Sequence, residues 1–221
     1  MVLELTSWNI HVQDDCVQQL IKKDATLALL IKKVGNLQIN IRPNPLKSLI
    51  RSIIGQQITV KVAASIFEQL TDAINDEWTV DKLSEIEDTQ MKSFGLSKSK
   101  INYIHNLVTH IQHGKLDLEN LHKLSNDEVI RTLTEVKGIG QWTAEVFLLF
   151  TLQRPDVVPV HDVGLQKSAQ WLYGTTKAQR KAQLALCSER WKHCASIGAF
   201  YLWEAIHQDY LAYDSIHDIN D

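Results

Sequence analysis

Apolar residues recur along most of this chain at intervals of three and four positions, the spacing that gathers them on one face of an α-helix. Val62, Ile66, Leu70 and Ile74 show this spacing within a helix predicted over about residues 59–75. The alternation of apolar and polar residues that is typical of half-buried strands is scarce. We therefore expect an all-α fold, with the helices arranged in two lobes.

Glycines mark the ends of several predicted helices, because glycine readily adopts the left-handed conformation that terminates a helix. Gly95, Gly114 and Gly174 are the expected stop signals. Residues 38–45 contain two prolines and form the most irregular segment, with a short strand as the alternative to a plain link. The further helices are predicted over about residues 14–32, 45–57, 97–113, 126–134, 141–151, 162–173, 177–190 and 195–211.

These elements divide the chain into three predicted parts. A helical arm over residues 1–43 packs on a core over residues 44–211, and residues 212–221 form a C-terminal tail. Of the 221 residues, 44% are apolar and 22% are charged, so a packed core is expected. No apolar run reaches the roughly 18 residues that a spanning helix needs, and residues 1–15 show no basic segment followed by an apolar run, so we expect no secretory leader. We expect a monomer that binds no membrane and stays in the cytoplasm, or in the nucleus of a eukaryote.

Net charge and cysteine content restrict the partners and the compartment. The formal net charge of −3 disfavours a broad basic surface that coats DNA, so any contact with nucleic acid must be local. Cys16, Cys187 and Cys194 are an odd number of cysteines in a chain large enough to fold without crosslinks. This content is typical of a reducing compartment, and we expect no disulfide framework.

Two glycines one position apart occur in the segment Val-Lys-Gly-Ile-Gly-Gln-Trp-Thr-Ala, residues 136–144. A Gly-x-Gly sequence between two helices can be a simple turn. Glycine also permits close approach of another backbone, and the amides at the start of the second helix point outward. A phosphate can bind there, at the positive end of the helix dipole.

The complete segment resembles the helix-hairpin-helix of DNA glycosylases, in the form found in the DNA-3-methyladenine glycosylase II family. The resemblance extends over about residues 44–210 and implies the two-lobed helical glycosylase fold, without the N-terminal β domain of longer members. It implies a hairpin over residues 133–142 and DNA backbone contacts by Lys137, Gly138, Gly140 and Thr143. It also implies a monovalent cation held by the backbone carbonyls of Thr134, Val136 and Ile139.

Asp162 follows an apolar, proline-bracketed run and stands at the start of a predicted helix. By itself an aspartate in this place is an N-cap. The resemblance assigns the family's catalytic aspartate to Asp162. Cleavage of a glycosidic bond builds positive charge on the sugar, and a fixed anion stabilises that charge. Asp156 is the nearest rival and is interpreted as a turn residue, while the adjacent His161 is expected to face solvent.

Residues 53–59, Ile-Ile-Gly-Gln-Gln-Ile-Thr, resemble the Ile-Ile-Gly-Gln-Gln-Ile-Ser segment of the same family. The resemblance implies that Gln57 enters the space left by a flipped base. An enzyme that acts on a base inside a duplex must extrude the base and fill the gap. The alternative is an ordinary polar residue at a helix end.

Trp142 and Trp203 match aromatic positions of the family's base pocket, where an electron-rich ring stacks on a cationic purine. As isolated residues, both tryptophans would be expected in the core, where aromatic side chains usually lie. Val146 stands where a third pocket aromatic is expected. Trp142 also occupies the position of the lysine in strand-nicking glycosylases, and without an amine no Schiff base can form. The sequence therefore predicts a monofunctional enzyme without lyase activity at abasic sites.

These features predict a hydrolase of base excision repair that removes alkylated purines from double-stranded DNA. The candidate bases are 3-methyladenine, 7-methylguanine, ethenoadenine and hypoxanthine. Cys187 and Cys194 have the spacing of two ligands in an iron–sulfur loop, but no further cysteine follows, so we expect no cluster and no other cofactor. The alternatives are a non-catalytic helix-hairpin-helix module that binds DNA, and a glycosylase for another lesion such as oxidised guanine or mismatched adenine.

Overall fold

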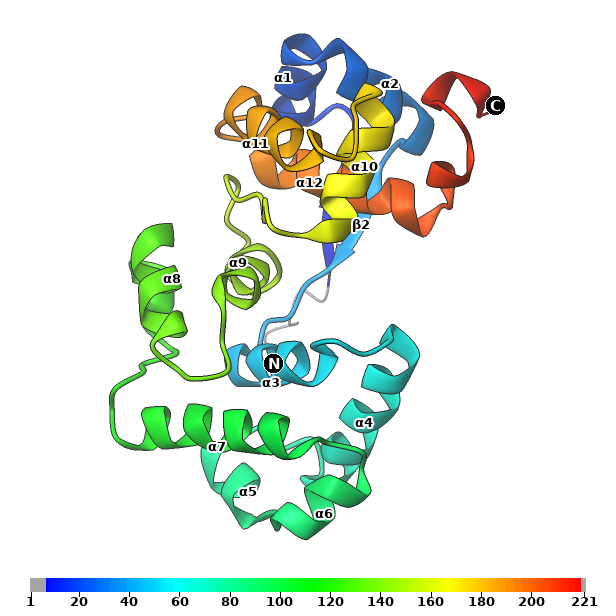
Figure 1. The fold of residues 1–221 in the computed structure, drawn as a ribbon. Helices are drawn as coiled ribbons and strands as arrows, with labels where there is room; N and C mark the ends of the chain where they lie inside the picture. The colour runs from blue at the N-terminus through cyan, green and yellow to red at the C-terminus, as the bar shows by residue number, and fades with distance from the viewer. Residues whose placement is uncertain (1–6, 220–221) are drawn as a thin grey trace. The chain divides into compact units, whose positions relative to one another are not determined.

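A computed structural model describes residues 7–219 of the chain as two compact units (Figure 1). The first unit combines the part up to Ile41 with the part from Gln153 onward, and the second unit is Arg42–Leu152. The N-terminal arm predicted over residues 1–43 thus belongs to the same unit as the C-terminal helices. No helix within residues 7–219 is both long enough and apolar enough to cross a bilayer.

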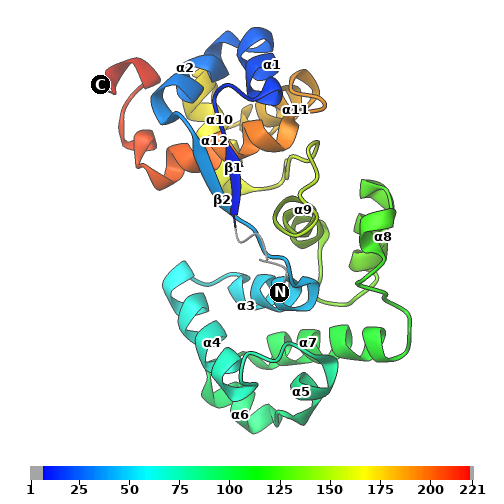
Figure 2. The same ribbon diagram turned by 180° about the vertical axis from the view of Figure 1, so that it is seen from behind.

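The first unit is built around α12 (Ala195–His207), which is apolar on nearly all sides and therefore buried. Phe200, Tyr201 and Leu202 are each at most 2% exposed. The helices around α12 come from both ends of the chain, as Figures 1 and 2 show. They are α1 (Asp15–Lys23), α2 (Ala25–Val34), α10 (Val163–Tyr173) and α11 (Arg180–Arg190), followed by the short 3-10 helices η2 (Tyr210–Ala212) and η3 (Ile216–Asp218).

The first unit also contains a small antiparallel sheet. Its strands are β1 (Ser7–Ile10) and β2 (Leu37–Asn40), in a register that pairs Ser7 with Asn40. The alternative of a short strand near residues 38–45 is therefore confirmed. The ring of Trp8 on β1 meets Phe200 edge-on, with 5.7 Å between the ring centroids, so β1 covers part of α12.

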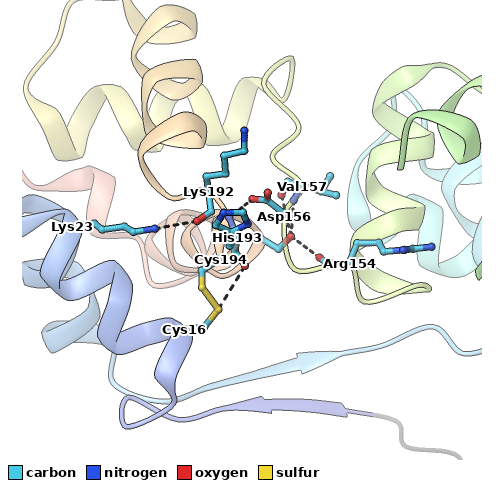
Figure 3. The surroundings of a disulfide bond; sticks show 9 residues. Cys16, Lys23, Arg154, Asp156, Val157, Lys192, His193 and Cys194 are labelled. Atoms are coloured by element: carbon cyan, nitrogen blue, oxygen red, sulfur yellow. Dashed lines mark hydrogen bonds between the residues drawn. A yellow bond between two sulfur atoms is a disulfide. The ribbon is translucent and has the colours of Figure 1, made fainter. Parts of the chain in front are cut away.

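A disulfide joins Cys16 of α1 to Cys194, the residue that precedes α12 (Figure 3). The expectation of no disulfide framework is therefore corrected by this bond. α1 packs against α12, which brings the two Cα atoms to 5.6 Å, within the range that the bond requires. The cysteines are 178 positions apart, so their number and spacing do not reveal the pairing. Cys187 is a buried thiol outside this bond.

The second unit is entirely helical within the described residues. α3 (Pro45–Gly55) forms its centre and contacts α4 (Val60–Ala73), α7 (Lys98–Gln112) and α9 (Gln141–Phe150), an arrangement visible in both ribbon views (Figures 1 and 2). Leu49, Ile50 and Ile53 of α3 are fully buried. The other elements are α5 (Val80–Glu85), α6 (Asp88–Ser93), η1 (Leu121–Lys123) and α8 (Asn126–Thr134).

Most predicted helices are present, with two corrections. The single helix predicted over residues 14–32 is two helices, because Asp24 ends α1 and caps α2 by accepting a hydrogen bond from the amide of Leu27. α5 and α6 have no counterpart in the prediction, since six residues are too few for a clear apolar period. Gly174 ends α10 with φ +62°, the left-handed conformation expected of a helix stop.

Candidate active site and DNA interface

The loop between α8 and α9 contains both glycines of the predicted hairpin, in different backbone conformations. Gly138 has φ +111°, and a Cβ atom there would overlap the ring of Tyr103. Gly140 has an ordinary φ of −94°, and a Cβ atom there would meet nothing within 4 Å. The protein's own packing therefore requires a glycine at position 138 but not at position 140. The missing side chain of Gly140 instead leaves the start of α9 open to close approach by a ligand.

α9 begins directly after Gly140, which is its N-cap. The first hydrogen bond of the helix runs from the amide of Ala144 to the carbonyl of Gly140, so the preceding amides lie outside the helix's own ladder. Lys137 and Gly140 are exposed, and Trp142 is 39% exposed. Thr143 is only 2% exposed, so its hydroxyl is not presented to solvent.

The loop between α3 and α4 holds Gln57 in a left-handed conformation, with φ +58°. Residues other than glycine adopt this conformation seldom and at a cost in free energy. The Gln57 side chain is exposed, and Val60 at the start of α4 is 86% exposed. Nε2 of the neighbouring Gln56 donates a hydrogen bond of 2.9 Å to the carbonyl of Gly138. This bond connects the loop that carries Gln57 to the hairpin.

The predicted cation donors are backbone carbonyls of the hairpin, where several carbonyls accept hydrogen bonds. Asn106 and Gln56 donate to the carbonyls of Lys137 and Gly138, and the amide of Ile139 donates to that of Val136. Thr134 ends α8, where the last carbonyls have no partner inside the helix. Backbone carbonyl oxygens are ligands that coordinate alkali cations in other proteins. The predicted donor set of Thr134, Val136 and Ile139 therefore fits a monovalent cation in its chemistry.

Asp162 lies at the start of α10 and is half-buried. Its Oδ1 accepts a hydrogen bond of 2.8 Å from the amide of Leu165, as expected of an N-cap. Asp162 directly follows the strap, which we define as residues 154–161. Residues 157–159 of the strap are buried. Nε2 of Gln166 on α10 donates to the carbonyl of Val160 at 2.8 Å, which ties the strap to the helix. Asp162 is thus fixed by the buried residues 157–159 that precede it and by the first turn of α10.

Trp203 lies on α12, one turn before Ile206. A Cβ atom at Gly164 would lie 3.2 Å from Cδ1 of Ile206 and 3.0 Å from Oδ1 of Asp162, so the start of α10 is in close contact with this part of α12. Trp203 is partly exposed, and its ring centroid is 6.1 Å from that of Phe200. The first unit therefore brings Asp162 and Trp203 onto adjoining segments.

Asp156, the rival carboxylate, has a different environment. Its Oδ1 accepts a hydrogen bond of 2.9 Å from the amide of His193 (Figure 3). Oγ of Ser196 donates to the carbonyl of Arg154 at 2.6 Å, so the same end of the strap is anchored to the start of α12. These contacts support the interpretation of Asp156 as a turn residue. His161 is exposed, as expected.

The predicted site residues are divided between the two units. Asp162 and Trp203 belong to the first unit, and Gln57, Trp142 and the hairpin belong to the second. Val146, which stands in place of a third pocket aromatic, is 4% exposed on α9.

Known proteins with similar sequences place the chain in a family. The family model described as HhH-GPD superfamily base excision DNA repair protein matches residues 50–193. DNA-3-methyladenine glycosylase 1 of Schizosaccharomyces pombe is 30% identical over 210 residues, which cover 92% of this chain and 89% of that protein. The chain belongs to the HhH-GPD superfamily of base excision DNA repair proteins.

Solved structures agree with this assignment. A DNA-3-methyladenine glycosidase from Bacillus halodurans superimposes on this HhH-GPD protein with a TM-score of 0.86 and 33% identity, covering 96% of this chain and 98% of that one. The 3-methyladenine DNA glycosylase of Schizosaccharomyces pombe, in complex with abasic DNA, gives a TM-score of 0.78 and 29% identity, covering 88% of this chain and 97% of that one. The protein is a DNA glycosylase of base excision repair with the helical fold predicted from its sequence.

Sequence reasoning missed the side chains that support the two loops of this glycosylase. The motif of residues 53–59 includes Gln56, to which the sequence assigns no role. Lys100, Tyr103 and Asn106 stand three positions apart on α7, and all of them contact the α3 end or the hairpin. Their spacing is visible in the sequence, but polar residues at helical spacing usually indicate a solvated face.

Proposed function

We propose that this glycosylase releases alkylated purines from double-stranded DNA by hydrolysis of the N-glycosidic bond, with Asp162 as its catalytic carboxylate. The observation that carries the proposal is the position of Asp162, half-buried at the start of α10 and preceded by a strap whose residues 157–159 are buried. A fixed anion with little water around it stabilises positive charge far better than one in bulk solvent. The names of the relatives, which are 3-methyladenine glycosylases, support the class of substrate.

The chemistry requires little beyond this carboxylate. A purine alkylated at N3 or N7 is cationic, so the bond between C1′ and the base nitrogen breaks with its electrons leaving on a neutral base. Positive charge then develops on the sugar, where the charge of Asp162 stabilises it. Water adds to C1′ and loses a proton, and Asp162 orients or activates this water. No second acid is needed to protonate the leaving group.

The tryptophans supply base recognition in this proposal. Trp142 is 39% exposed and Trp203 is partly exposed, and each ring can stack on a cationic purine. Trp142 also stands where a lysine nucleophile would be required, so the enzyme leaves an intact abasic strand. Borohydride should therefore trap no covalent complex between protein and DNA. A reduced adduct would contradict the monofunctional assignment.

The remaining roles concern DNA binding. Gln57 fills the gap left by the extruded base, and the start of α9 binds a backbone phosphate together with Lys137. The carbonyls of Thr134, Val136 and Ile139 would hold a monovalent cation, whose positive charge would favour phosphate binding at the hairpin, and no other cofactor is proposed. We further propose that the enzyme acts as a monomer in the cytoplasm, or in the nucleus of a eukaryote.

A panel of lesion duplexes tests this function. Methylated DNA and oligonucleotides with 7-methylguanine, ethenoadenine, hypoxanthine or oxidised guanine are incubated with the protein, and the released base is measured by chromatography. We expect the cationic alkylpurines to be released faster than the neutral bases. Release from the oxidised-guanine duplex alone would contradict the substrate class. Tight binding of every duplex without release would favour a non-catalytic DNA-binding module.

A further inference from the structure

One side of α7 contacts two loops that are far apart in the sequence. Nζ of Lys100 donates a hydrogen bond of 2.7 Å to the carbonyl of Ile54, in the last turn of α3. Nδ2 of Asn106 donates to the carbonyl of Lys137 in the hairpin at 3.2 Å. Between them, the ring of Tyr103 fills the space that a side chain at Gly138 would need. Residues three apart on a helix are neighbours on its surface, so these contacts form a continuous stripe.

Gln56 completes the connection from the other side. Its backbone caps α3, and its side-chain amide donates to the carbonyl of Gly138 at 2.9 Å. Gln57, which follows immediately, is the residue with φ +58°. An unusual backbone conformation persists only where the surrounding structure holds it. Gln56 and Lys100 are the residues whose side chains connect this loop to the hairpin and to α7.

The ammonium group of Lys100 suits the carbonyls at the end of α3. The last carbonyls of α3 lack partners within the helix, and a cation is favoured at the negative end of a helix dipole. Lys100 meets both needs, and its partial burial lowers the pKa of its ammonium group below the usual value.

We propose that Lys100, Tyr103, Asn106 and Gln56 form a brace that fixes the distance between the Gln57 loop and the hairpin, and that Lys100 and Gln56 are positioning residues for base extrusion. The proposal rests on the proposed function, in which Gln57 fills the gap while the hairpin holds the backbone. With the phosphate held at the hairpin, Gln57 enters the gap only if the loop cannot retreat. Loss of the brace lowers the fraction of extruded base and leaves the bond-breaking step unchanged.

The test compares Lys100→Met, which keeps the length of the side chain and removes the charge and donor, with Lys98→Met, an exposed lysine two positions earlier on α7. Single-turnover excision is measured on a lesion in a fully paired duplex and on the same lesion opposite an abasic site, where extrusion is easier. A fluorescent base analogue beside the lesion reports extrusion directly. Lys100→Arg tests whether another donor restores the effect.

We expect Lys100→Met to reduce the excision rate on the paired duplex roughly tenfold and to reduce the extrusion signal in parallel. On the lesion opposite the abasic site, the excision rates of Lys100→Met and wild type should agree within about twofold. Lys98→Met should match wild type on both substrates, and Lys100→Arg should recover most of the loss. Equal losses on both substrates, or wild-type rates on both, would overturn the brace. If Lys100→Met does not fold, Gln56→Met gives the same comparison. Wild-type protein that excises no base would refute the proposed function instead.

Discussion

Reduction of the bond between Cys16 and Cys194 should destabilise this glycosylase measurably. The bond connects α1 to the residue before α12, the central helix of the first unit, and it closes a loop of 178 positions. Cys16 is partly exposed, so a small thiol in solution can reach it. Cys187 is buried and remains a thiol in both states, which makes it an internal control.

The magnitude follows from the length of the loop. Restriction of the unfolded chain by a crosslink of 178 positions corresponds to about 5 kcal/mol at 25 °C in the chain-entropy model. Measured values are usually smaller, about 2–4 kcal/mol, and we expect this range. For a chain of this size, each kcal/mol shifts the melting temperature by roughly 2–4 °C. Reduction should therefore lower the melting temperature by roughly 4–16 °C.

The assay counts thiols and measures melting on the same sample. Folded protein is incubated with oxidised glutathione, denatured without reductant and titrated, which should give one thiol per chain against three after reduction. Melting curves are recorded for oxidised and reduced wild type, Cys16→Ser and Cys187→Ser. Cys16→Ser should melt like reduced wild type in either buffer, and Cys187→Ser should keep the redox shift. Three thiols after oxidation, or equal melting temperatures for both forms, would refute the reasoning.

Three further changes have expected outcomes. Gly138→Ala should lower the free energy of unfolding by at least about 2 kcal/mol, because the left-handed conformation and the Tyr103 ring leave no room for a methyl group. Gly140→Ala should leave the melting temperature nearly unchanged and weaken DNA binding, and normal affinity in a binding titration would contradict close phosphate approach at α9. Asp24→Asn should lose about 2–4 kcal/mol in a denaturant titration, because the carboxylate accepts hydrogen bonds from Tyr173, Trp191 and Arg190 at a buried site. Burial raises the pKa of Asp24, but these hydrogen bonds lower it by more, so the net pKa is below the usual value. The contribution of Asp24 to the free energy of unfolding is therefore present at neutral pH and is lost as the pH falls from about 4 through the lowered pKa. An Asp24→Asn variant with the same acid unfolding profile as wild type would contradict this.

Structural features that depend only on neighbouring residues could be predicted from the sequence. The apolar steps on α4 and the long apolar run of α9 indicate helices whatever the fold, and a glycine pair between helices indicates a tight turn. Asp162 at a helix start was also visible, because an N-cap depends on the residues beside it. Its chemical role came from the resemblance to a family, since an isolated N-cap aspartate has no chemistry of its own.

Features that depend on distant contacts could not be predicted. Nothing in the sequence pairs Cys16 with Cys194, because the pairing follows from the packing of α1 on α12. The break at Asp24 was hidden because the apolar period continues through it, and only the buried partners of its carboxylate explain the aspartate. Lys100 is likewise an ordinary surface residue until α7 is placed beside the end of α3.

The most direct test of the central claim is single-turnover excision by Asp162→Asn beside wild type and Asp156→Asn. Asparagine caps a helix about as well as aspartate, so folding and DNA affinity should change little. Loss of an aligned charge at a water-poor site should slow base release by on the order of a hundredfold or more. Asp156→Asn retains an oxygen that can accept from the amide of His193 and should excise at nearly the wild-type rate. Near-normal base release by folded Asp162→Asn protein would contradict the account, and a selective loss in Asp156→Asn would assign the carboxylate to that residue.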